Sequence, residues 1–99
     1  MKFFVIAAQS PTVQQQNAIT MLFRGKPEYG FWHWTSEFWI LDVQSEAITS
    51  VTLRDMISVA APGLSFAVFG LDPRPGDWAM LSDPKWSEWM EGSWPKLPG

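Results

Sequence analysis

The sequence predicts an α+β domain with a ferredoxin-like βαββαβ order and a short Trp-rich helix at its C-terminus. Three observations support this prediction. Short continuous apolar runs near the start, middle and end of the chain are typical of buried strands. Two segments with apolar residues at helical spacing separate these runs. An aromatic-rich pair of segments around a polar turn indicates a central hairpin. In this topology the last strand lies at a sheet edge, beside the first strand.

The first strand is expected at Lys2–Ala8, an apolar run that polar residues follow at once. Ser10 and Pro11 then match a hydroxyl cap and a first helical residue. A helix is expected from Thr12 to Arg24, and Gly25 is placed to end it. Its expected inward face consists of Val13, Ala18, Met21 and Leu22.

The hairpin is expected at Tyr29–Trp34 and Phe38–Val43, with a three-residue turn between the strands. A second helix is then expected, with Thr52 as its cap and Asp55 as the capping-box partner. Its apolar residues fall at i, i+3, i+4 and i+7, and Pro62 follows the stripe. They are Leu53, Met56, Ile57 and Ala60.

The last strand is expected at Leu64–Leu71, and a Pro/Gly-rich loop follows it. Asp83 and Pro84 resemble the cap and first residue of a short helix that carries Trp86, Trp89 and Met90. Residues 92–99 are expected to form an extended tail. No internal repeat or linker is visible, so residues 1–99 are expected to form a single domain.

Both faces of the predicted sheet are apolar. In the first strand, for example, Phe3 and Val5 point to one face while Phe4 and Ile6 point to the other. One layer of helices covers only one face. The second face must meet a twin subunit, another partner or the Trp-rich C-terminus. The last strand has no Lys or Pro to discourage pairing, so the C-terminal segment or a second subunit is expected to cover its edge.

Composition restricts the classes of function. Of the 99 residues, 46% are hydrophobic and 17% are charged, and the formal net charge of −3 argues against a nucleic-acid partner. The absence of cysteine excludes disulfides, thiol catalysis and thiolate metal sites. No apolar run is long enough to cross a bilayer. We therefore predict a soluble cytoplasmic protein with no membrane contact and no cofactor.

The stretch from Gly30 to Leu41, Gly-Phe-Trp-His-Trp-Thr-Ser-Glu-Phe-Trp-Ile-Leu, resembles the SinR-like group of small ferredoxin-fold proteins. That group is structurally akin to the CRISPR adaptation nuclease, the VapD toxin and the antitoxin ribonuclease GhoS. Leu53–Ile57 and Gly76–Ala79, with the tryptophans that follow, resemble its second helix and C-terminal pattern. The resemblance spans about residues 3–90 and implies the fold and dimerisation.

The same resemblance does not supply an active site. The nuclease members usually carry an Asp at the end of the first strand, which helps to hold a divalent metal. Here that place reads Ala7-Ala8-Gln9-Ser10. The neutral amide of Gln9 is a poor sole ligand for Mg²⁺, which favours carboxylates. No metal site is expected, and Asp72, Asp77 and Asp83 are better explained as turn and cap residues.

His33 is the only histidine, and it lies between two tryptophans. It could act as a general base beside Ser36, with Arg54 as an anion-binding group, in a metal-independent endoribonuclease. A histidine that packs against rings explains the same pattern, because no second titratable group stands at a defined spacing. We favour the packing interpretation.

Five aromatic residues crowd the hairpin: Phe31, Trp32, Trp34, Phe38 and Trp39. They could stack nucleic-acid bases, but such platforms are normally ringed by Lys and Arg. Between Gly30 and Gln44 there is neither. The aromatic residues are therefore better explained as core and protein interface.

These observations favour a non-catalytic protein-interaction module, inhibitory or regulatory, that acts as a homodimer through an aromatic sheet surface. An antitoxin or a phage-encoded inhibitor of host defence would fit. The expected interface residues are Trp32, Trp34, Trp39 and Phe69, with Trp78, Trp86 and Trp89 as the C-terminal cover. Two alternatives remain: the ribonuclease described above, and a small-ligand sensor with a Trp-lined pocket.

Overall fold

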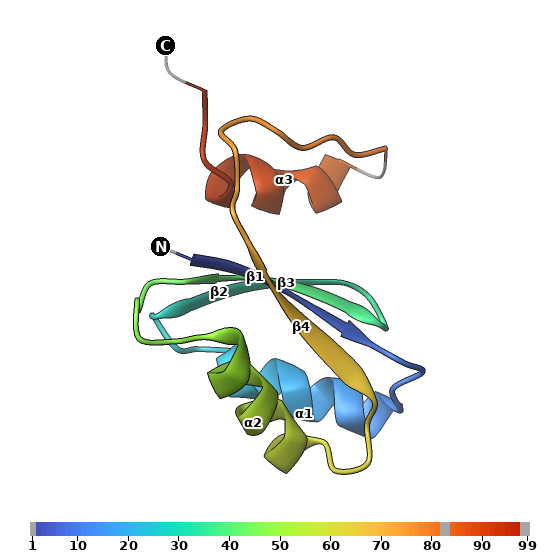
Figure 1. Ribbon diagram of the computed structural model, residues 1–99. Helices are drawn as coiled ribbons and strands as arrows, with labels where there is room; N and C mark the ends of the chain where they lie inside the picture. The colour runs from blue at the N-terminus through green and yellow to red at the C-terminus, as the bar shows by residue number, and fades with distance from the viewer. Residues whose placement is uncertain (1, 82–83, 98–99) are drawn as a thin grey trace.

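The computed structural model describes residues 2–81 and 84–97, and it describes the backbone but not the side chain of Trp86. The elements in chain order are β1 (Lys2–Ala8), α1 (Val13–Phe23), β2 (Tyr29–Thr35), β3 (Phe38–Val43), α2 (Ser50–Ala60), β4 (Phe66–Leu71) and α3 (Pro84–Ser93). The predicted ferredoxin-like fold with a C-terminal helix is confirmed. In Figure 1 the sheet lies between α1 and α2 on one side and α3 on the other.

The sheet has the order β2-β3-β1-β4, and all three pairs are antiparallel. The most apolar strand, β1, therefore lies inside the sheet, where both of its edges are paired. The predicted position of the last strand at the edge beside β1 is confirmed. This strand begins at Phe66 rather than Leu64, because Leu64 and Ser65 belong to the connection from α2.

Both predicted helix caps are wrong by a few residues. Thr12, not Ser10, caps α1: its Oγ1 accepts from the Gln15 N–H at 3.0 Å, and the Gln15 side chain accepts from the Thr12 N–H at 2.9 Å. Ser10 instead adopts a left-handed conformation with φ 46°. For α2 the cap is Thr49, and Thr52 is its capping-box partner. In each of these capping boxes, two backbone N–H groups that lack a partner within the helix are hydrogen-bonded. A single hydroxyl cap satisfies only one of them.

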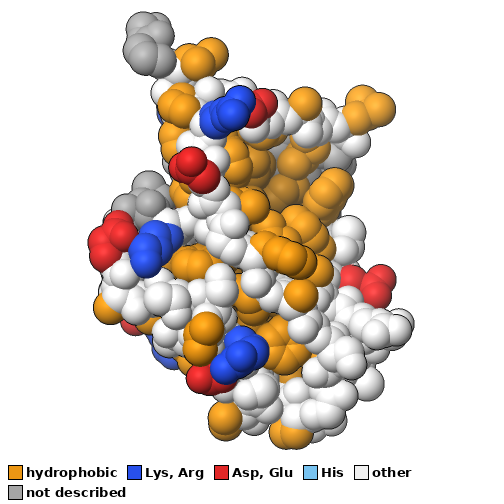
Figure 2. All heavy atoms as spheres, viewed as in Figure 1, with side chains coloured by type: hydrophobic (Ala, Val, Ile, Leu, Met, Phe, Trp, Pro, Cys, Tyr) orange, Lys and Arg blue, Asp and Glu red, His pale blue; other side chains and the backbone are white. Residues whose placement is uncertain are grey.

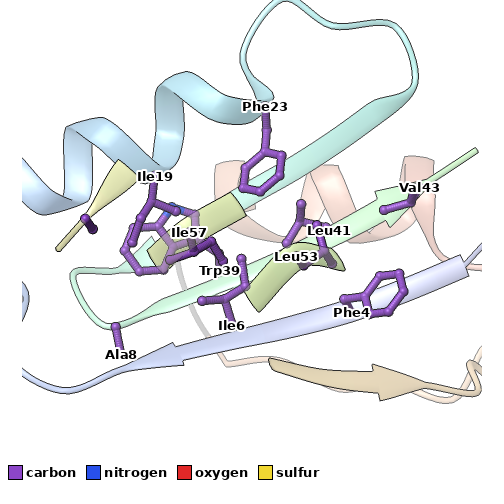
Figure 3. Packing of buried hydrophobic residues seen from close by; sticks show 11 residues of the cluster. Phe4, Ile6, Ala8, Ile19, Phe23, Trp39, Leu41, Val43, Leu53 and Ile57 are labelled. Atoms are coloured by element: carbon purple, nitrogen blue, oxygen red, sulfur yellow. The ribbon is translucent and has the colours of Figure 1, made fainter. Parts of the chain in front are cut away.

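The main core lies between the sheet and the two helices α1 and α2 (Figure 3). Its fully buried side chains include Trp39, Leu41, Ile19, Phe23, Leu53 and Ile57. The predicted stripe on α2 is correct at Leu53 and Ile57, which are the helix's two buried residues. The predicted inward face of α1 is wrong at Val13 and Met21, which are 73% and 64% exposed, whereas Leu22 packs against the core as expected. Polar Thr20 turns inward instead, because the indole N–H of Trp39 donates to its hydroxyl.

A second, smaller cluster lies on the opposite face of the sheet. Its buried members are Phe3, Trp32, Ile40 and Met90. Half-buried side chains from the C-terminal segment pack around it: Trp78, Met80, Trp89 and Trp94. Of the three coverings that the sequence allowed for this face, the C-terminal segment occupies part of it. Because α3 continues to Ser93, the extended tail begins two residues later than expected. The predicted cap Asp83 lies outside the described residues.

No helix in the described ranges is both long enough and apolar enough to span a bilayer.

Candidate protein-interaction surface

The C-terminal segment covers the second face of the sheet unevenly. In the strand register, Phe3 lies opposite Leu71 on β4 and Asp42 on β3, and this row of side chains lies nearest the C-terminal segment. Two residues further along β1, Val5 lies between Phe69 and Ile40, and only the Ile40 side of this row is buried. Cover is therefore densest around Phe3, which is 1% exposed, and thins towards Ala7 and Ala67, which are exposed.

The exposed and half-buried side chains beyond this cover form an apolar surface, which we call the uncovered strip. Its members are Val5, Ala7, Trp34, Phe38, Ala67 and Phe69. Phe69 is 55% exposed and Trp34 is 44% exposed. Figure 2 shows hydrophobic side chains gathering in a band that runs from the C-terminal helix down over the sheet. Contiguous exposed apolar patches often mark interaction sites, whereas apolar residues scattered singly over a surface do not.

The rings at one side of the uncovered strip are held in place. Trp34 stacks on Trp32 with ring centroids 5.4 Å apart, and it meets Phe38 edge-on at 6.0 Å. Trp32 is itself fixed from the other side by Trp89, at 6.3 Å. A preordered aromatic ring loses little conformational entropy on binding, so Trp34 is suited to be an anchor for a partner.

An open depression of about 430 Å³ continues the uncovered strip beyond the end of β1. Its lining residues are Ala7, Ala8, Gln9, Glu37, Ser65, Phe66 and Ala67. Glu37 supplies the only charge in this lining, and one of its carboxylate oxygens accepts from the Ser10 N–H at 2.9 Å. The surface thus combines an apolar floor with one anchored carboxylate at its rim.

The residues predicted for the interface fall in three different places. Trp34 and Phe69 are exposed and belong to the uncovered strip. Trp32 is only 8% exposed because the C-terminal segment packs over it. Trp39 has no exposed surface and lies in the main core, so the structure places it away from any partner.

The residues predicted for the C-terminal cover lie in that position where the structure describes them. Trp78 and Trp89 both pack against the second cluster, half-buried. The side chain of Trp86 lies outside the described residues. Trp94, which the sequence did not single out, also belongs to this layer, and it meets Phe3 edge-on at 5.0 Å. Its role could not be predicted because it lies in a Pro/Gly-rich tail, a composition that predicts an extended segment.

His33 points to the helix-covered face and stacks on Trp39, with ring centroids 4.0 Å apart and planes 4° from parallel. Burial lowers the pKa of its imidazole, and a backbone hydrogen bond with Ser36 acts in the opposite direction. Its Nε2 is buried with no hydrogen-bond partner in the described part of the chain. This geometry fits the packing interpretation of His33.

A backbone hydrogen bond places Ser36 beside His33, but the structure does not bring the third predicted catalytic residue, Arg54, to them. Ser36 is exposed in the turn that joins β2 to β3. Arg54 lies on α2 and pairs with Asp55 at 2.9 Å. The helix α2 packs on β4, which is the opposite sheet edge from β2. Three strand spacings of about 4.8 Å separate these edges, so Arg54 and His33 are about 14 Å apart or more.

Among the residues that the structure describes, no group of three or more His, Asp or Glu side chains is placed to hold a metal ion.

A second hollow lies within the C-terminal segment itself and has a volume of about 380 Å³. Its walls include Trp78, Trp94 and Lys96. Two hydrogen bonds of 2.7 Å hold it together: the Trp94 indole N–H donates to the Arg74 carbonyl, and the Gly76 N–H donates to the Pro95 carbonyl. The volume lies within the range of small-molecule sites.

Comparisons of this chain with protein-family models, with curated proteins and with solved structures give no match. The resemblance to the SinR-like group therefore stays a prediction.

Proposed function

We propose that this chain is a non-catalytic protein-interaction module that acts as a homodimer and regulates or inhibits a protein partner. The observation that carries this proposal is the uncovered strip, a preordered aromatic surface beside an unpaired edge strand. An antitoxin or an inhibitor of a defence protein needs only such a surface, because it acts by occupying its target.

The chemistry of the uncovered strip indicates the kind of partner. Its floor is apolar and aromatic, and Trp is among the residues most enriched in binding hot spots. Its rim carries Glu37, whose carboxylate is fixed by the Ser10 N–H. A matching partner would present an apolar side chain to Trp34 and a Lys or Arg to Glu37.

The experiment is affinity capture from a lysate of the source organism, with a matched pair of variants. Trp34→Ala removes an exposed ring at the β2 side of the uncovered strip, whereas Met21→Ala removes a side chain that is more exposed but lies on α1. We expect a protein that wild type and Met21→Ala retain and that Trp34→Ala loses. Equal retention by all three proteins would show that the uncovered strip is not the binding surface.

Light scattering over a concentration series tests the homodimer directly. We expect the mass to rise from one copy towards two as concentration increases. A mass of one copy at every concentration would contradict the homodimer but leave the capture experiment able to support a monomeric interaction module.

The Trp-lined hollow supports a second candidate function, a small-ligand sensor. A ligand that enters it would contact Trp78 and Trp94, and it would meet one charge of each sign, from Glu91 and Lys96. Titration with nucleotides, followed by intrinsic fluorescence, tests this. A saturable change that Trp94→Phe abolishes would support the sensor, and a flat titration would contradict it for nucleotides.

The ribonuclease alternative gains no support from the arrangement of His33, Ser36 and Arg54. Its test is an assay on a mixed RNA substrate, with His33→Ala as the control. Cleavage that disappears in a folded His33→Ala variant would overturn the non-catalytic proposal.

A further inference from the structure

The outer edge of β4 offers backbone groups for pairing. Across the β1–β4 pair, the Gln9 N–H donates to the Ser65 carbonyl at 2.9 Å. Hydrogen-bonded pairs alternate along an antiparallel ladder, so the odd-numbered residues of β4 direct their N–H and C=O groups to β1. The even-numbered residues Phe66, Val68 and Gly70 direct theirs outward, where no strand of the described chain pairs with them.

The two edges of the sheet differ in how well they are protected. The β2 edge carries a register irregularity between His33 and Thr35, and α3 packs close to it. Bulges and covering helices are standard ways to blunt an edge. The β4 edge has a regular register over Phe66–Leu71, and this strand contains no proline and no charged residue. It is therefore the edge that favours addition of another strand.

We propose that β4 pairs antiparallel with β4 of a second copy of this chain, about a two-fold axis at Val68. This inference rests on the proposed function, because it assumes that the chain self-associates. It goes further by naming the surface and the register. The two four-stranded sheets then form one continuous sheet, and the uncovered strips of the two copies meet across the axis.

The sequence of β4 is self-complementary in this register. Pairing Val68 with its own copy places Ala67 opposite Phe69 of the second copy, on the face of the uncovered strip. It also places Phe66 opposite Gly70 of the second copy, on the helix-covered face. Each aromatic ring thus lies against a residue with little or no side chain, which is how edge glycines and small residues are covered in natural sheets.

Space and charge on the helix-covered side are compatible with this pairing. A groove of about 200 Å³ runs between α2 and the outer edge of β4, lined in part by Ser50, Val51 and Arg54. Phe66 of the second copy would project into it, because a side chain built on Gly70 would point towards Ser50. The guanidinium of Arg54 is neutralised by Asp55 at 2.9 Å, so the two copies of α2 can approach without repulsion.

The area available indicates a weak dimer. A standard interface takes roughly 800 Å² from each partner. A six-residue strand is only about 20 Å long, so pairing along this one edge is a small interface. Phe69 and Val51, 55% and 56% exposed, add apolar area on either side. The expected dimer is therefore weak and concentration-dependent.

Single cysteines test the pairing directly, because the chain contains none of its own. In Val68→Cys the two thiols face each other across the axis, within the Cα separation that a disulfide accepts. We expect mild oxidation to link this full-length variant on the order of tenfold faster than Val59→Cys, an 81% exposed control on α2. Equal rates for the two variants would overturn the proposal.

The register is tested by mixing two variants at exposed positions, which also guards against misfolding of Val68→Cys. Ala67→Cys and Phe69→Cys should each link poorly alone and link well when mixed, because residue 67 faces residue 69 of the second copy. A shift of the register by two residues would instead make one of these variants link to itself. That result would overturn the axis at Val68.

These outcomes separate this inference from the proposed function. A dimer seen by light scattering, with no linkage through residues 67, 68 or 69, would overturn the β4 pairing and leave the homodimer standing. A monomer at every concentration would overturn the β4 pairing and the homodimer, and the capture experiment would then decide whether the chain is a monomeric interaction module. A dimer that links through Val68→Cys and through the mixed pair supports both.

Discussion

The two faces of this sheet are similarly apolar in sequence, but different elements cover them and to different extents. On the first face, α1 and α2 fill the space with side chains such as Ile19, Leu53 and Ile57, and nothing large is left open. On the second face, α3 and its flanking loop reach only one end. The difference lies in how the chain is tethered: α1 and α2 each connect two strands and so must cross the sheet, whereas α3 follows the last strand and is held from one side.

The chemistry of the two faces differs as well. The first face is filled mainly by aliphatic side chains around Trp39 and Phe23. The second is built largely from rings: Trp32 stacks with both Trp34 and Trp89, and Trp94 meets Phe3. Stacked rings can stay ordered while partly open, so this face can be both a core and a binding surface.

The largest effect is expected at the centre of the closed face. Trp39→Ala should lower the free energy of unfolding by about 3–5 kcal/mol, because it removes a fully buried ring and leaves a cavity. It also removes the ring on which His33 stacks. Urea unfolding followed by circular dichroism measures the loss. A loss below about 1 kcal/mol would show that the first face is not the tightly packed one.

A smaller effect is expected beneath the C-terminal cover. Met90→Ala should lower the free energy of unfolding by about 2 kcal/mol, because Met90 is buried but packs in a thinner layer. The variant should also bind more of a hydrophobic dye as α3 loosens from the sheet. Glu88→Ala, an exposed change on the same helix, is the control. Equal dye binding by the two variants would contradict a cover that depends on Met90.

Within the second face, Trp32 and Trp34 offer a matched pair on one strand. Trp34→Ala should cost about 1 kcal/mol or less, since it removes ring stacking from a side chain that is 44% exposed. Trp32→Ala should cost about 3 kcal/mol, since Trp32 is only 8% exposed. Urea unfolding of the two variants side by side measures the difference. Equal costs would mean that the boundary of the uncovered strip does not run between them.

The smallest effect concerns pH and the first face. Burial lowers the pKa of His33 in the folded state below its ordinary value of 6.5. The unfolded chain then takes up a proton that the folded chain refuses, so this contribution to stability is present above pH 6.5 and is lost as pH falls below it. Urea midpoints between pH 8 and pH 5, measured at about one-unit steps, should fall in wild type and stay flatter in His33→Gln.

Asp42 also contributes to the pH dependence of stability, with the opposite sign. Burial raises the pKa of its carboxyl above the ordinary 3.8, against a smaller opposing effect of the Gly30 N–H. The folded chain therefore binds its proton more readily, and the stability gained is lost as pH rises from 3.8 through the folded pKa. This sign is opposite to that of His33, because the contribution of Asp42 is largest at low pH. A wild-type curve no steeper than that of His33→Gln would contradict a buried neutral imidazole.

The order of the elements could be predicted from local patterns, whereas the exact helix starts could not. Apolar runs and helical stripes extend over many residues, so small errors do not change the element type. A helix start depends on which of several neighbouring hydroxyls finds a partner three residues on. Thr12 and Thr49 do so through Gln15 and Thr52, and these pairs outcompete the predicted caps Ser10 and Thr52.

The candidate site could be predicted in part. Trp34 and Phe69 were expected at an interface and are exposed, but Trp39 has the same sequence character and is fully buried. Alternation along a strand tells which residues share a face, and it does not tell which face a helix will cover. For the proposed β4 register, the alternation of large and small residues is visible in the sequence. Only the structure, however, shows that the described strands leave the outer edge of β4 unpaired.

The sequence by itself determined the ferredoxin-like order, the central position of β1, the apolar character of both sheet faces and the lack of cysteine chemistry. These follow from side-chain alternation, helical periodicity and composition, which are local properties of the chain. Only the tertiary structure decided that the C-terminal segment covers one end of the second face and leaves Trp34, Phe69 and the β4 edge open. The reach of a packed segment depends on where its tether leaves the sheet and on which rings meet, and neither is written in any short stretch of residues.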